Sequence, residues 1–205
     1  QNVSNKVVDE DGILTFDLLV NDIDEDTLII NSSDIINGSI YIEENTFTLI
    51  PESNFNGLIP GIEIIVSDGE LDDSTIFDVT VNPVNDGPIL GELPSDANID
   101  ENGIYELELS GADIDGDILT FEASIDGNGS IDVTESILTI TPNTYFNGNI
   151  EVTVLVTDIG GLSDSGAFIL TVNPTNDAPV LEDIVDQIID EDSDLTIPVF
   201  ASDID

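Results

Sequence analysis

Apolar and polar residues alternate along short stretches of this chain with a period of two. In residues 76–82, Phe77, Val79 and Val81 fall on one face, and polar residues take the positions between them. This period predicts β-strands that bury one face, and no stretch has the period of a helix. The pattern also places these residues inward: Leu14, Phe16, Leu18, Val20, Tyr105, Leu107, Leu109, Ile150, Val152, Val154, Val156, Phe168, Leu170 and Val172.

Turn-forming residues interrupt these strands about every ten positions, which is typical of an all-β sandwich. The chain also repeats itself. "VNPVNDGPIL" begins at residue 81 and "VNPTNDAPVL" begins at residue 172, which are 91 positions apart, and "FNG" recurs at 55–57 and 146–148. We therefore predict tandem sandwiches of about seven strands each, arranged end to end, with repeats at 1–86 and 87–177.

A third copy begins at residue 178, where "IDEDS" and then "SDID" return before the sequence stops at Asp205. Residues 178–205 are too few to bury a core of their own. We predict that they are the incomplete start of a third repeat and that the native chain continues beyond Asp205.

The composition restricts the chemistry. The chain has 45 Asp and Glu residues against a single basic residue, Lys6, for a formal net charge of −44. Such a charge excludes nucleic acid as a partner and disfavours anionic membrane surfaces. Because His and Cys are absent, there is no imidazole base, no thiolate and no zinc ligand set. Carboxylate and amide oxygens remain, and these are the ligands of a hard cation such as Ca²⁺.

The acidic residues fall into two groups. Asp78 and Glu151 alternate with core positions along strands, and we predict that they lie on a solvated sheet face. A second group lies at strand ends and turns: Glu10, Asp22, Asp24, Asp68, Asp86, Glu101, Asp113, Asp115, Asp158, Asp177, Glu191, Asp203 and Asp205. Two carboxylates about 4 Å apart repel by roughly 4 kcal/mol at an effective dielectric near 20. These groups therefore either share a cation or stand apart in water as ordinary turn residues.

Four motifs in the second repeat, taken together, resemble a known family. "DEN" at 100–102, "DIDGD" at 113–117, "VTD" at 156–158 and "VNPTNDAPVL" at 172–181 resemble the cadherin repeat. They are closer to the bacterial cadherin-like tandem repeats of large surface and secreted adhesins, in the cadherin/Ig-like superfamily. The resemblance implies Ig-like sandwiches on the bacterial cell surface or secreted, with Ca²⁺ at the junctions between repeats.

Carried over by motif, the resemblance implies three sets of calcium ligands. The first junction would use Glu10, Asn85, Asp86, Asp113, Asp115 and Asp158. The second would use Glu101, Asn176, Asp177, Asp203 and Asp205. Half of a site shared with a preceding repeat would consist of Asp22, Asp24 and Asp68.

Several functions remain open at this stage. The leading hypothesis is a set of non-catalytic, calcium-stiffened extender repeats whose partners are the neighbouring repeats of the same chain, with homophilic or glycan contacts as further candidates. The alternative is a carbohydrate- or protein-binding module, suggested by Asn128, Asn143 and Asn147, or an accessory domain of a secreted enzyme. Catalysis by a carboxylate pair is the least favoured, because no cleft-forming insertion interrupts the repeat.

Overall fold

A computed structural model describes residues 3–204, and within this range it contains strands and turns but no helix. No helix in that range could therefore cross a membrane. The chain divides into two compact units, Gln1–Asn85 (unit 1) and Asp86–Asp205 (unit 2). The predicted repeat boundaries, including a separate third repeat from residue 178, stay predictions.

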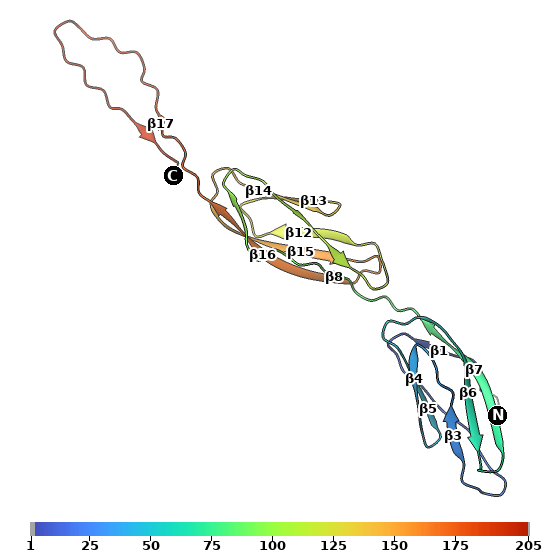
Figure 1. Ribbon diagram of the computed structural model, residues 1–205. Helices are drawn as coiled ribbons and strands as arrows, with labels where there is room; N and C mark the ends of the chain where they lie inside the picture. The colour runs from blue at the N-terminus through green and yellow to red at the C-terminus, as the bar shows by residue number, and fades with distance from the viewer. Residues whose placement is uncertain (1–2, 205) are drawn as a thin grey trace. The chain divides into compact units, whose positions relative to one another are not determined.

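Unit 1 is a sandwich of two sheets (Figure 1). The four-stranded sheet has the order β1 (Lys6–Asp9), β7 (Asp72–Asn82), β6 (Gly57–Ser67), β3 (Ile29–Ser32). The three-stranded sheet has the order β2 (Leu14–Asp17), β5 (Thr46–Pro51), β4 (Gly38–Glu43). The first and last strands, β1 and β7, run parallel, and the other neighbours are antiparallel.

Unit 2 repeats this arrangement (Figure 1). Its four-stranded sheet has the order β12 (Thr120–Ile125), β15 (Gly148–Thr157), β16 (Ser163–Asn173), β9 (Ala97–Asp100), and its three-stranded sheet is β10 (Tyr105–Glu108), β14 (Ile137–Pro142), β13 (Gly129–Thr134). Two short pairs are added: β8 (Ile89–Leu90) with β11 (Gly111–Ala112), and β17 (Val180–Leu181) with β18 (Ala201–Ser202).

The alternating residues build the two cores, as predicted. In unit 1, Phe77, Val79 and Val81 are at most 2% exposed. The rings of Phe16, Phe47 and Phe77 pack against one another at centroid distances of 4.8–5.9 Å. In unit 2 the predicted inward residues of β15 and β16 are all buried. Residues of the shorter strands, such as Tyr105 and Leu107, are partly buried against the core. The prediction of an all-β fold with Ig-like sandwiches is confirmed.

Asp78, an acidic residue of β7, makes a contact that the alternation of apolar and polar residues did not predict. The N–H of Gly61 donates to Asp78 Oδ1 at 2.9 Å, where β6 has an irregular register between Ile59 and Ile62. Gly61 has a φ of 67°, a left-handed conformation that glycine adopts without strain. Asp78 therefore holds a β-bulge and is half-buried, whereas Glu151 is exposed, as predicted.

Candidate metal centre

A buried glutamate follows the first strand of the four-stranded sheet in each unit. Glu10 and Glu101 are 4% and 6% exposed. Their N–H groups donate to the carbonyls of Asn82 and Asn173 at 2.9 Å, so each adds one rung to the parallel strand pair. The next residue, Asp11 or Asn102, has a positive φ, which short polar residues tolerate in a tight turn. This turn fixes the glutamate at the exit end of its own unit.

Each glutamate holds the segment that leaves its sandwich. Glu10 Oε1 accepts the N–H of Val84 at 2.5 Å, and Glu10 Oε2 accepts Asn56 Nδ2 at 3.2 Å. Glu101 Oε1 accepts the N–H and the hydroxyl of Thr175 at 2.5 and 3.3 Å. The same contact in both repeats fixes the start of each "NP.ND" segment against its sandwich.

The aspartates of residues 113–117 form a compact turn in unit 2. Asp113 Oδ1 accepts the N–H groups of Asp115 and Asp117 at 2.9 and 3.3 Å, which closes an Asx turn. Asp115 Oδ2 in turn accepts the N–H of Asp86 at 2.8 Å. The residue at which unit 2 begins is therefore bonded to this turn.

Asp158 joins the same group from the end of β15. It is 5% exposed, and its Oδ1 accepts the N–H of Leu162 at 2.8 Å. The pKa of Asp117 lies above its ordinary value, first because of desolvation and then because of the negative charges of Asp113, Asp158 and Asp115. Asp113, Asp115 and Asp158 therefore lie close enough to Asp117 to repel its charged form.

One oxygen in this group fits a cation. Asp113 Oδ2 is buried, and it has no hydrogen-bond partner among the residues that the structure describes. A buried carboxylate oxygen without a donor is costly. Lys6, the one basic residue of the sequence, lies in unit 1 and stacks over Phe16 at 4.9 Å. The donor set of unit 2 is therefore all oxygen and anionic, which suits Ca²⁺.

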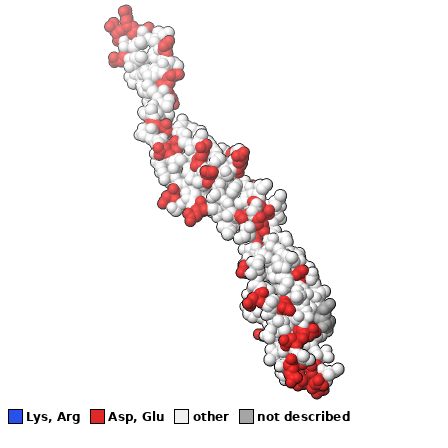
Figure 2. Space-filling model, turned by 45° about the vertical axis from the view of Figure 1, so that its right-hand side comes forward, with Lys and Arg blue, Asp and Glu red and all other residues white. Residues whose placement is uncertain are grey.

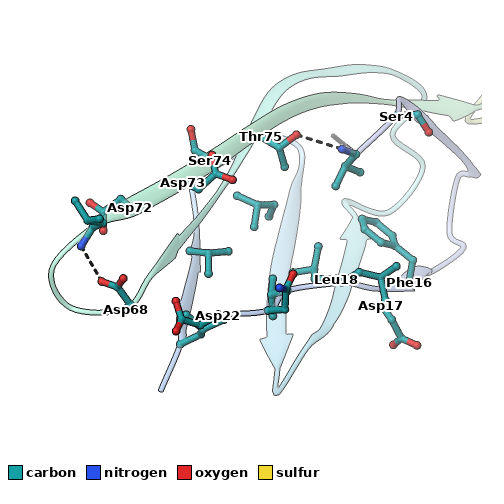
Figure 3. Close-up of a pocket in the computed structure, with 18 of the residues that line it drawn as sticks. Ser4, Phe16, Asp17, Leu18, Asp22, Asp68, Asp72, Asp73, Ser74 and Thr75 are labelled. Atoms are coloured by element: carbon teal, nitrogen blue, oxygen red, sulfur yellow. Dashed lines mark hydrogen bonds between the residues drawn. The ribbon is translucent and has the colours of Figure 1, made fainter. Parts of the chain in front are cut away.

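The equivalent turn of unit 1 has the same construction. Asp22 Oδ1 accepts the N–H groups of Asp24 and Asp26 at 2.7 and 3.2 Å. Asp68 Oδ1 accepts two N–H groups at 2.7 Å, those of Glu70 and Leu71, and these bonds lower the pKa of Asp68. Asp22 and Asp68 line one pocket (Figure 3), and Asp24 is not among the lining residues.

The remaining predicted ligands lie in the segments that leave the units. Asn176 Nδ2 donates to the carbonyl of Asp177 at 2.6 Å, and Asp203 follows β18 and is exposed. Asp205 lies outside the described residues. The predicted grouping of Glu10 and Asn85 with Asp86, and of Glu101 with Asp203, stays a prediction.

Two residues of these sites were not among the predicted ligands. Asp117 is the third aspartate of an alternating triplet, so its spacing was a usable signal. Asn56 binds Glu10 across 46 positions of sequence, and no local pattern connects the two. On the face shown in Figure 2 the acidic side chains gather in patches, and no basic side chain is visible.

Cadherin fragments are among the solved structures with a similar fold. Human Protocadherin-24 EC1-2 matches with a TM-score of 0.54 at 13% identity, over 84% of this chain and 94% of that one. The human Desmocollin-1 ectodomain matches with a TM-score of 0.45 at 15% identity, over 89% of this chain and 41% of that one. At 13% identity the Protocadherin-24 match describes the fold alone.

An enzyme is also among the matched structures. The endo-fucoidan hydrolase MfFcnA4_H294Q from glycoside hydrolase family 107 has a TM-score of 0.35 and 21% identity, and the match covers 85% of this chain. The chain spans 28% of the length of that hydrolase. No curated protein matches the sequence significantly.

Sequence comparison with protein families agrees with the fold. The bacterial Ig domain family matches twice, over residues 1–82 and 85–171, so each unit carries one match. Together the two matches span most of the sequence, and they agree with the cadherin-like, Ig-like repeats that the motifs predicted. The chain belongs to the bacterial Ig domain family.

Proposed function

We propose that the units are non-catalytic, calcium-binding extender repeats of a long extracellular bacterial adhesin or surface protein. In this function Ca²⁺ binds where one repeat passes into the next and stiffens the connection. The proposal has three supports: an Ig-like fold related to cadherin fragments, a repeated buried glutamate, and repeated aspartate turns.

The observation that carries the proposal is the buried Oδ2 atom of Asp113, which lacks a hydrogen-bond partner among the described residues. The pKa of Asp117 in the same turn is raised, first by desolvation and then by the negative charges of Asp113, Asp158 and Asp115. Such a group is unfavourable on its own, and a divalent ion reverses the sign of its electrostatic energy. Asp86, Asp113, Asp115 and Asp158 would hold the ion from unit 2, and Glu10 and Asn85 would complete the site from unit 1.

Two further sites follow from the repeat. Glu101 with Asn176, Asp177, Asp203 and Asp205 would bind calcium at the second junction. The turns carrying Asp22, Asp24 and Asp68 in unit 1 would supply half of another site. When bound, Ca²⁺ supplies charge compensation and several oxygen bonds, and the protein supplies ligands whose turns are already closed by hydrogen bonds.

Extracellular calcium suits such sites. Extracellular modules bind the ion with dissociation constants of roughly 0.1–1 mM, far weaker than cytosolic sensors. With Ca²⁺ bound, ligands shared between adjoining repeats would hold the repeats together. When a chelator removes the ion, the negative charges of the two repeats would repel each other, and the chain would become flexible at each junction.

Calcium titration of the 205-residue chain tests the proposal, with binding measured by calorimetry, stability by thermal unfolding and dimensions by small-angle scattering. We expect saturable binding, a higher melting temperature and a narrower range of dimensions with calcium. Asp113→Asn should keep its turn, because an amide oxygen still accepts both N–H groups, but should weaken binding at least about tenfold, equal to 1.4 kcal/mol.

Glu122→Gln is the matched control, because it removes one exposed charge from β12 of the same unit. Its affinity for calcium should equal that of the wild-type chain. Absence of saturable binding at millimolar calcium, or equal affinity for Asp113→Asn, would overturn the proposal. Saturable binding of a glycan by the calcium-free chain would instead favour the binding-module alternative.

A further inference from the structure

Strand β4 of unit 1 has a free edge. It pairs with β5 alone and lies at the end of the three-stranded sheet (Figure 1). Within residues 3–204, no strand pairs with its other edge. Natural edge strands commonly carry lysine, proline or a bulge, which prevents pairing with other chains. The sequence of β4, GSIYIE, has none of these, and its register with β5 is regular. The free edge can therefore accept a further strand.

An exposed tyrosine stands on the outer face of β4. Ile40 and Ile42 pack against the core of unit 1, so Tyr41 between them points away from the core, and it is 56% exposed. Its cross-strand neighbour on β5 is Thr48. An open hollow of about 480 Å³ lies over this face, and it is lined by Tyr41, Glu43, Glu44, Thr46 and Thr48.

The surroundings of the tyrosine ring are acidic. Glu43 follows Tyr41 on the same face of β4, and Glu44 lies in the turn between β4 and β5. Both glutamates are exposed. Thr46, which faces Glu43 across the strands, donates its hydroxyl to Asp17 Oδ1 at 3.1 Å, so a third carboxylate lies on this face. Carboxylates and the face of an aromatic ring both attract a cation.

The equivalent hairpin of unit 2 differs at these positions. By the 91-residue spacing, Asp132 has the place of Tyr41 and Thr134 has the place of Glu43. The hydroxyl of Thr134 donates to Asp132 Oδ2 at 2.9 Å, so this carboxylate already has a donor. The ring beside exposed carboxylates is therefore a property of unit 1 and not of the repeat in general.

These features determine the kind of partner. A strand added to β4 would place one residue across from Tyr41, with the two Cβ atoms about 4.5–5.5 Å apart. A second copy of the chain is disfavoured, because each copy has a formal net charge of −44 and like charges repel. The single basic residue, Lys6, lies over the ring of Phe16, so these 205 residues do not supply the cation.

We infer that β4 binds an extended basic segment of another protein, in which arginine or lysine alternates with β-branched apolar residues. The backbone of the segment pairs with the free edge of β4. One basic side chain lies over the ring of Tyr41, and the next basic side chain on that face pairs with Glu43. The basic residues alternate because side chains on one face of a strand recur every second residue. Main-chain bonds supply affinity and the alternate side chains supply specificity, as in other cases of β-augmentation.

The inference goes beyond the calcium proposal, because none of these contacts needs a metal ion. A short peptide that alternates arginine and valine tests it. The peptide is titrated into the 205-residue chain with chelator present, at about 0.15 M salt, where charges more than about 8 Å apart are largely screened. A second peptide has proline in place of each valine, so it keeps the arginine charges but lacks main-chain donors for pairing.

We expect the valine peptide to bind at least about tenfold more tightly than the proline peptide, equal to about 1.4 kcal/mol. Amide hydrogen exchange in β4 should slow when the valine peptide binds, and exchange in β13 of unit 2 should stay the same. Equal affinity for the two peptides would mean attraction by charge alone and would overturn the inference. Slower exchange in β13 but not in β4 would also overturn it.

Two tyrosine variants locate the site without changing the charge of the chain. Tyr41→Ala should weaken binding of the valine peptide about fivefold, which corresponds to a cation–π contact of about 1 kcal/mol. Tyr145→Ala is the matched control, because Tyr145 is 46% exposed and lies in unit 2. The control should bind the peptide as the wild-type chain does. If Tyr41→Ala binds as tightly as the control, the inference is wrong.

Discussion

The buried carboxylate of Glu101 offers the sharpest test of how each sandwich holds the segment that leaves it. Glu101 is 6% exposed, and its Oε1 atom accepts the N–H and hydroxyl of Thr175. Glu101→Ala removes both bonds and leaves the part-buried N–H of Thr175 without its acceptor. Glu101→Gln keeps the shape and can keep one oxygen in place, so it removes the charge alone.

Hydrogen bonds to a charged group contribute about 1.5–3 kcal/mol, and neutral ones about 0.5–1.5 kcal/mol. We therefore expect Glu101→Ala to lower the free energy of unfolding of unit 2 by about 2–3 kcal/mol. For a domain of this size that loss lowers the melting temperature by roughly 10–20 °C. Glu101→Gln should cost about 1 kcal/mol, the difference between charged and neutral bonds.

The measurement is urea unfolding followed by circular dichroism, in chelator so that no metal contributes. Glu106→Gln, at an exposed position of β10 in the same unit, is the control and should stay within about 0.5 kcal/mol of the wild-type chain. The reasoning is refuted if Glu101→Ala unfolds at the same urea concentration as the control. It is also refuted if the Gln and Ala variants lose equal stability, because the retained acceptor would then contribute nothing.

Three further predictions concern charge and packing. The pKa of Asp117 is raised, so its contribution to stability is complete below pH 3.8 and is lost as pH rises through the folded-state pKa. With chelator present, the Asp117→Asn variant should not lose this stability as the pH rises. If the wild-type chain and the variant have the same pH profile of stability, the prediction is contradicted. Phe47→Ala, at a fully buried ring, should cost about 3–5 kcal/mol in urea unfolding. Gly166→Thr should cost about 1–3 kcal/mol by displacing the strand packed on it, whereas Gly87→Ala, with only ordinary contacts, should cost little.

The parts of the fold that depend on local periodicity were predictable from sequence. Phe77, Val79 and Val81 alternate with polar residues because one face of β7 is buried, and the structure buries these three. The turn that carries Asp113 and Asp115 was predictable because the same motif recurs at Asp22 and Asp24. The repeat made both inferences firm, since each pattern appears twice.

The parts that depend on contacts between distant segments were not predictable. Asp78 looked like an ordinary solvated acid, and only the register of β6 and β7 shows that it bonds to Gly61. Likewise, Asn56 Nδ2 donates to Glu10 Oε2 across 46 positions of sequence, and no local pattern connects the two residues.

The parallel pairing of β1 and β7 has a mechanical consequence. Lys6–Asp9 lies in register with Val79–Asn82, so the first and last strands of unit 1 are bonded side by side and point the same way. A pulling force that enters before β1 and leaves after β7 loads these bonds along the strand direction, and they must break together. Unit 2 has the same pairing between β9 and β16. Unit 1 is thus built to resist extension by shear of its terminal strands, whereas an antiparallel terminal pair would unzip one bond at a time.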